Sequence, residues 1–209
     1  MDYGIVLRKA QRRGKEPMGR KPGETRQRMV MAAVELLRER GASAVTVDAV
    51  LARSGAPRGS VYHHFPGGRD ELILAAVRHA ADYITSRIDR TVESGDPVQA
   101  LDGFVRFWKK TLSDTDYLAG CPVVAVAVDA HQDPPEAAAL ARDVFTQWQA
   151  KLQQLLLNRG TDSARAARVA TLMVAAIEGA VILCRTHRDH APLDDVLIEL
   201  TPMLEAVGG

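Results

Sequence analysis

The stretch from Thr46 to Phe65, TVDAVLARSGAPRGSVYHHF, constrains the fold of this chain more than any other. Thr46 can cap a helix, and Ser54-Gly55-Ala56 then interrupts the apolar pattern, because glycine tolerates backbone angles that other residues avoid. Pro57 fits the first turn of a second helix, where its missing N–H costs little. Two short helices joined by a glycine-containing turn form a helix-turn-helix, a unit whose second helix enters the DNA major groove.

Helical periodicity continues along the rest of the chain and predicts an all-α protein of about nine helices without strands. A helix from Thr25 to Arg40 precedes the motif and ends at Gly41. Further helices are expected over 57–65, 69–93, 97–113, 121–130, 135–158, 163–185 and 193–207, the last bent at Pro202. The alternating Val and Ala of 121–130 also fit a strand, but the neighbouring segments are all helical.

Positive charge is concentrated at the N-terminal end of the chain. Residues 1–69 contain 14 Lys and Arg against 6 Asp and Glu, whereas residues 70–209 contain 13 against 20. Only the N-terminal part is therefore expected to meet a polyanion. We predict a flexible basic arm over 1–22, which could touch DNA or remain a solvated tail, and a DNA-binding domain over 23–85.

Several classes of protein are not supported by the sequence. Its apolar runs are shorter than the roughly 20 residues that span a bilayer, and Ile5-Val6-Leu7 is too short for a signal peptide, so a cytoplasmic protein away from membranes is expected. Cys121 and Cys184 make no metal pattern, and the His and Asp residues of 187–195 lack tight ligand spacing. Without a nucleophile and base, phosphate loop or zinc motif, we predict no enzyme, cofactor or metal.

Two motifs carry a resemblance to a known family. Gly59-Ser60-Val61-Tyr62-His63-His64-Phe65 fits a Gly-x-Val/Leu-Tyr-x-x-Phe pattern, and residues 22–85 around it resemble the tetracycline-repressor (TetR) family of bacterial regulators. The ending Phe65-Pro66-Gly67-Gly68-Arg69-Asp70, with Gly120-Cys121-Pro122 downstream, is similar to the LmrA/YxaF-like branch. The resemblance implies a ligand-sensing and dimerisation domain over residues 86–209. It also implies a homodimer that represses from a palindromic double-stranded DNA operator and is released by a small, largely apolar effector. A ligand-independent DNA-binding protein and an activator are the alternatives.

The residues expected to contact DNA lie in and around the motif. Arg58 can donate two N–H bonds to a guanine edge, and Tyr62 presents a hydroxyl suited to phosphate. Thr46 begins a helix whose free N–H groups can bind phosphate. The resemblance equates Arg69 with a phosphate-contacting Lys of the family. The predicted DNA-binding residues are Thr46, Arg58, Gly59, Ser60, Tyr62, His63, His64 and Arg69, whereas Val50, Leu51, Val61 and Phe65 are expected in the core.

Aromatic residues gather in the middle helices and suggest a pocket for the effector. The predicted ligand-binding residues are Phe104, Phe107, Trp108, Tyr117, Cys121, Phe145, Trp148, Met173, Ile177 and Glu178. Glu178 is an acid in an otherwise apolar helix, so it could pair with a cationic ligand or hydrogen-bond a polar one. In the alternative, the aromatic residues are ordinary core and Glu178 pairs with Arg106 or another base.

The helix expected over 163–185 has apolar residues on more than one face. One stripe can serve the domain core, and the other then needs a second partner. The resemblance implies that this helix and the last one form a four-helix bundle across a two-fold axis. A central helix that is buried on all sides of a monomer would show the same pattern.

Overall fold

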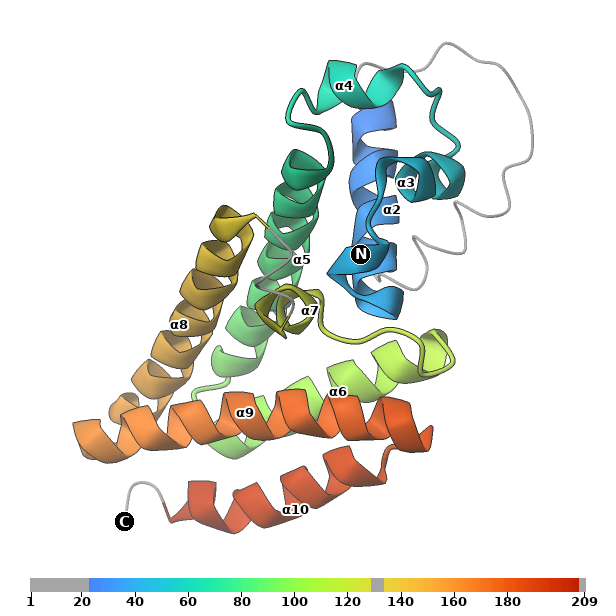
Figure 1. Cartoon of the computed structure of the whole chain (residues 1–209). Helices are drawn as coiled ribbons and strands as arrows, with labels where there is room; N and C mark the ends of the chain where they lie inside the picture. The colour runs from blue at the N-terminus through green and yellow to red at the C-terminus, as the bar shows by residue number, and fades with distance from the viewer. Residues whose placement is uncertain (1–22, 129–133, 207–209) are drawn as a thin grey trace.

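The computed structural model describes residues 23–128 and 134–206 of the chain. Nine α-helices, one short 3-10 turn and no strand make up this part, which confirms the predicted all-α class. Figure 1 shows α2, α3 and α4 at one end together with the start of α5, and α9 and α10 side by side at the other end. The predicted basic arm over 1–22 lies outside the described residues.

The helix bounds follow local sequence signals. The elements are α2 (Glu24–Arg40), the 3-10 turn η1 (Ala42–Ala44), α3 (Val47–Ser54), α4 (Ser60–His64), α5 (Gly68–Val92), α6 (Pro97–Asp114), α7 (Pro122–Val128), α8 (Pro135–Asn158), α9 (Ser163–His187) and α10 (Ala191–Glu205). Thr46, Asp96 and Asp162 cap α3, α6 and α9 by accepting hydrogen bonds from free backbone N–H groups of the first turn. The segment that also fitted a strand is the helix α7.

The second helix of the motif is shorter than predicted. It begins at Ser60 rather than at Pro57, so Arg58 lies in the turn before α4. The reason is that both the backbone N–H and the hydroxyl of Ser60 donate to the carbonyl of Pro57, at 2.9 and 2.6 Å. These bonds span three residues and close a turn instead of a regular α-helical start.

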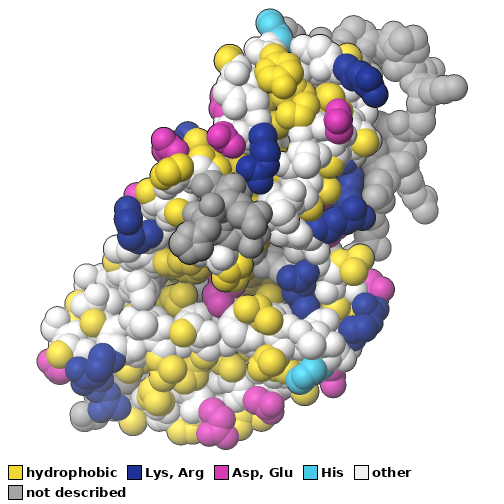
Figure 2. All heavy atoms as spheres, in the orientation of Figure 1, with side chains coloured by type: hydrophobic (Ala, Val, Ile, Leu, Met, Phe, Trp, Pro, Cys, Tyr) yellow, Lys and Arg dark blue, Asp and Glu magenta, His cyan; other side chains and the backbone are white. Residues whose placement is uncertain are grey.

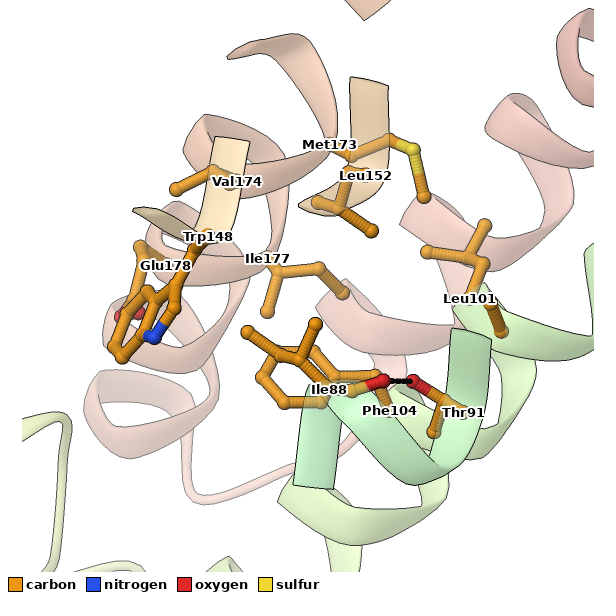
Figure 3. Close-up of a pocket in the computed structure, with 11 residues that line it drawn as sticks. Ile88, Thr91, Leu101, Phe104, Trp148, Leu152, Met173, Val174, Ile177 and Glu178 are labelled. Carbon is orange, nitrogen blue, oxygen red and sulfur yellow. Dashed lines mark hydrogen bonds between the residues drawn. The ribbon is translucent and has the colours of Figure 1, made fainter. Parts of the chain in front are cut away.

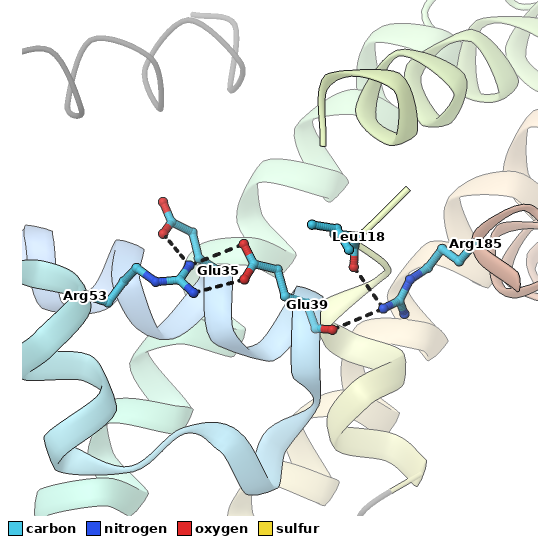
Figure 4. A network of polar contacts seen from close by, with 5 residues as sticks. All are labelled: Glu35, Glu39, Arg53, Leu118 and Arg185. Atoms are coloured by element: carbon cyan, nitrogen blue, oxygen red, sulfur yellow. Dashed lines mark hydrogen bonds and ion pairs between the residues drawn. The ribbon is translucent and has the colours of Figure 1, made fainter. Parts of the chain in front are cut away.

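The motif is fixed to α2 by an apolar core and by ion pairs. Val50, Leu51, Val61 and Phe65 are buried, which confirms their predicted core role. At the outer edge, Arg53 of α3 forms ion pairs with two carboxylates of α2, as Figure 4 shows. Its partners are Glu35 at 3.1 Å and Glu39 at 3.0 Å.

The C-terminal end of α2 contacts the second half of the chain. The last carbonyls of a helix have no partner within the helix. Here the Gly120 N–H donates to the Arg38 carbonyl at 2.9 Å. Arg185 of α9 donates from Nη2 to the Glu39 carbonyl at 3.3 Å and to the Leu118 carbonyl at 2.9 Å (Figure 4). We call this set of contacts the α2 joint.

The long helix α5 connects the two ends of the molecule. It packs against α2 near its start and against α6, α7 and α8 along its length. Its backbone passes the predicted domain boundary between residues 85 and 86 without a break. Trp148 of α8 donates to the Thr85 hydroxyl at 2.8 Å and so fixes the middle of α5.

One helix corrects an expectation about apolar runs. By length and hydropathy alone, α9 could cross a membrane, although the sequence was expected to hold no such segment. Yet α9 packs against α6, α8 and α10, and a core helix of a globular protein meets the same criterion. Its composition is therefore weak support for a membrane span.

Replacing Arg53 by Ala is expected to lower the free energy of unfolding by about 1 kcal/mol, because two partly buried carboxylates lose their partner. Urea unfolding followed by circular dichroism measures the change. Arg142→Ala is the matched control, since Arg142 and its partner Asp143 are both largely exposed. Equal effects of the two substitutions would contradict the role given to Arg53.

Candidate nucleic-acid interface and interior cavities

The start of α3 presents a hydroxyl to solvent. Thr46 caps the helix, since its Oγ1 accepts a hydrogen bond from the Ala49 N–H at 3.1 Å. A hydroxyl that accepts one bond can still donate its own hydrogen. Thr46 is exposed, so this hydrogen can reach a phosphate oxygen outside the protein.

Most of the predicted DNA-binding residues lie on the exposed side of the motif. Arg58, Gly59, Tyr62 and His63 are exposed, while Ser60 and His64 are partly buried. Tyr62 is the clearest case, because 64% of this large aromatic residue remains accessible. Between these side chains, the buried Val61 holds α4 against the core.

Arg69 has a structural role that the sequence did not indicate. Its Nε donates to the Val45 carbonyl at 2.9 Å, and its Nη2 donates to the Ala42 carbonyl at 3.0 Å. The side chain therefore ties the first turn of α5 to the segment before α3. Its phosphate contact stays a prediction, and no sequence motif would have revealed the carbonyl contacts.

Half of the predicted ligand-binding residues surround one small cavity, which we call the inner cavity (Figure 3). It lies between α5, α6, α8 and α9 and has a volume of about 30 Å³. This is room for one or two water molecules. The predicted residues on its wall are Phe104, Trp148, Met173, Ile177 and Glu178.

The remaining aromatic residues do not join this cavity, so the expected single aromatic pocket is divided. Phe107 and Trp108 line a separate space of about 20 Å³ against α2 and α5. Phe145 sets its ring edge-on to Trp148 at 5.4 Å between centroids. Tyr117 packs on His190 at 5.2 Å. The physical reason is that aromatic rings prefer to pack against a neighbouring ring. The space beside each of these rings is therefore occupied by another side chain and is not left open as part of one pocket.

A larger cavity lies where α2 meets α7 and α9, and we call it the junction cavity. Its volume is about 230 Å³. Two predicted ligand-binding residues, Cys121 and Glu178, are on its wall together with Arg185. No pattern in the sequence points to this space, because its walls come from three helices that are distant along the chain.

Glu178 is a buried acid between the two cavities. It lines both of them, is only 9% exposed, and its Oε2 has no hydrogen-bond partner among the described residues. Burial raises the pKa of Glu178 to about 7. Arg106, one of the bases considered as its partner, instead pairs with Asp102. The side chain beside the carboxyl is Cys121, and burial followed by the Glu178 charge raises the pKa of this thiol well above its usual value.

Two family models match this chain. Residues 30–76 match "Bacterial regulatory proteins, tetR family", and residues 97–198 match the C-terminal domain of LmrA/YxaF-like transcriptional regulators. An uncharacterized HTH-type transcriptional regulator of Mycobacterium tuberculosis is 40% identical over 87% of this chain and 94% of its own length. The regulator LmrA of Bacillus subtilis is 28% identical over 82% of this chain and 92% of its own.

Solved structures share the fold. A TetR-family regulator from Agrobacterium tumefaciens superposes with a TM-score of 0.78 at 20% identity, over 90% of this chain and all of that one. A regulator from Legionella pneumophila gives 0.77 at 18% identity, again over 90% of this chain and all of its own. At these identities the likeness concerns the fold alone.

The raised pKa of Glu178 predicts how stability depends on pH. As pH rises from about 4.5 to about 7, the unfolded chain ionises Glu178 while the folded chain keeps the proton, so wild-type stability falls by an amount on the order of 3 kcal/mol. Glu178→Gln removes this loss. The free energy of unfolding of the variant, relative to that of wild type, should therefore be higher at about pH 8 than at about pH 5. Urea unfolding at both pH values measures it. The exposed Glu93→Gln is the control, and parallel pH profiles of Glu178→Gln and wild type would disprove the assignment.

Proposed function

Since this chain belongs to the tetR family of bacterial regulatory proteins and is a transcriptional regulator with a helix-turn-helix domain, we propose that it is a repressor controlled by a small molecule. It binds a palindromic operator as a homodimer in the cytoplasm and leaves the DNA when an effector binds. The observation that carries the proposal is the exposed α4, with Tyr62 open to solvent beside a buried, supporting Val61.

The proposed DNA contacts divide into two kinds. Arg58 reads a guanine edge from the turn before α4, and Gly59 lets the backbone approach the DNA closely. Thr46, Tyr62 and Arg69 hold phosphates and so set the position of α4. Ser60, His63 and His64 contact bases or phosphates from the rest of the helix. The exposure of five of these eight residues supports the assignment, since Thr46, Arg58, Gly59, Tyr62 and His63 are exposed to solvent.

An apolar face on α9 and α10 supports the homodimer. Leu172 and Leu183 lie eleven residues apart, close to three helical turns, and so share one side of α9. They are 41% and 48% exposed, and Ile198 of α10 is 64% exposed. Figure 2 shows hydrophobic side chains in a band over these two helices. Pairing this face with a second copy makes a four-helix bundle and buries it. A monomer with α9 buried on all sides is at odds with this exposure.

The effector site belongs to the second half of the chain, near Glu178. This carboxyl borders both the inner and the junction cavity, and its unpartnered oxygen can accept a hydrogen bond from a polar group of the effector. The inner cavity has room for only one or two waters, so an effector there must first separate α6 from α9. Helix α5 then carries the displacement to the DNA-binding end.

Selection of bound DNA from a random pool is expected to recover a palindrome. Against that operator, Arg58→Ala should weaken binding about 10- to 100-fold and relax the base preference, since one bidentate base contact is lost. Tyr62→Ala should weaken binding equally across sequences without changing its salt dependence, because a hydroxyl releases no counterion. Gel shifts at several salt concentrations measure both, with Arg142→Ala as control. If either variant bound the operator as tightly as wild type, the DNA contact assigned to the replaced residue would be refuted.

Leu183→Asp should convert the homodimer to a monomer, because it places a charge in the apolar face of α9. Sedimentation of the full chain measures the mass. Tyr62→Ala, at the opposite end of the molecule, is the control and should stay dimeric. A dimeric Leu183→Asp protein would place the interface elsewhere.

A further inference from the structure

Two side chains on the wall of the junction cavity each have a buried polar atom without a partner. Oε2 of Glu178 is buried and has no hydrogen-bond partner among the described residues. Arg185 uses Nη2 for the α2 joint, while its buried Nε–H finds no acceptor in the same part of the chain. A buried polar group without a partner is costly, so a small turn of either side chain toward a ligand in the cavity is favourable.

The spacing of these groups defines the shape of that ligand. Glu178 and Arg185 are seven residues apart on α9, which is two helical turns or about 10 Å along the axis. Between them the wall is apolar, formed by Val181 of α9 and by Val124 and Ala125 of α7. A cavity of about 150 Å³ is enough to admit benzene, so the 230 Å³ of the junction cavity admit a larger ring system.

We propose that the junction cavity is the effector site, and that it binds an elongated aromatic molecule with a hydrogen-bond donor at one end and an anionic or acceptor group at the other. The donor end meets the Glu178 carboxyl, and the acceptor end meets the Arg185 guanidinium. This proposal rests on the proposed function, in that it assumes control by an effector. It places the effector in the junction cavity instead of the much smaller inner cavity, whose wall holds two of the six predicted aromatic residues.

An occupant of this site acts directly on the DNA-binding end. Leu37, Arg38 and Gly41 from the end of α2 are part of the cavity wall. An acceptor placed at Arg185 also competes with the Glu39 and Leu118 carbonyls for the same guanidinium. Gly120 leaves no spare room there, since a Cβ at this position would lie 2.6 Å from Arg185 Nη1. Binding therefore loosens or shifts the α2 joint, and α2 carries α3 with it through Arg53.

The test uses 6-amino-2-naphthalenesulfonate, a fluorescent probe whose amine N–H groups and sulfonate lie at opposite ends of a naphthalene. Fluorescence titration of the full chain measures binding without DNA. Ala125→Phe and, independently, Val124→Phe fill the junction cavity from α7, and each should weaken probe binding at least tenfold. Ala100→Phe fills the inner cavity instead and should leave the affinity within twofold of wild type. Circular dichroism confirms that each variant is folded, and two junction variants guard against the failure of one.

The outcomes separate the site from the function. Weak binding by the junction variants with normal binding by Ala100→Phe supports the proposal. The reverse pattern, or a wild-type chain that does not bind the probe, overturns it. Adding operator DNA tests the function separately: a chain that binds no operator refutes the proposed regulator whatever the probe shows. If the probe releases wild-type protein from the operator and Ala100→Phe abolishes that release, an effector-controlled repressor stands and the effector site is the inner cavity.

Discussion

The last carbonyl groups of a helix have no hydrogen-bond donor within the helix. At the end of α2, donors from the second half of the chain bind these carbonyls and so connect the two halves of the protein. Gly120 and Arg185, both from the second half, donate to the carbonyls of Arg38 and Glu39. Because an unsatisfied carbonyl is costly, the donors from the second half help to hold α2 in this position. The helix-turn-helix end and the second half of the chain are therefore connected by a few directional bonds as well as by the apolar core.

The same helix holds the motif on its other side. Arg53 fastens α3 to the carboxylates of Glu35 and Glu39, so Glu39 takes part in both connections, through its side chain toward α3 and through its carbonyl toward Arg185. Arg69 adds a second link, from the start of α5 to the segment before α3. The path from the junction cavity to α4 thus runs through α2 and α3, beside the longer route through α5.

Local signals predicted the helices well, but they did not predict how the aromatic side chains are arranged in the interior. Thr46 as a cap and the buried Val61 and Phe65 followed from residue type and spacing, because capping and helical periodicity act within a few residues. The start of α4 was misplaced because a turn around Pro57 is set by the bonds that Ser60 makes, which competed with the general preference of proline for a first helical turn. The aromatic residues were placed in one pocket because sequence shows that they are near each other along the chain, but not which neighbour each ring meets.

By itself, the sequence determined an all-α protein, a helix-turn-helix at its basic end, and an acid of unusual position at Glu178, since all three depend on residue type and short-range spacing. Only the tertiary structure decided that Glu178 stands between two cavities, that the larger one opens onto α2, and that Arg185 bonds to the carbonyl of Glu39. These features join residues up to 146 positions apart. They depend on how whole helices pack, and periodicity along one helix says which face is buried but not which helix will cover it.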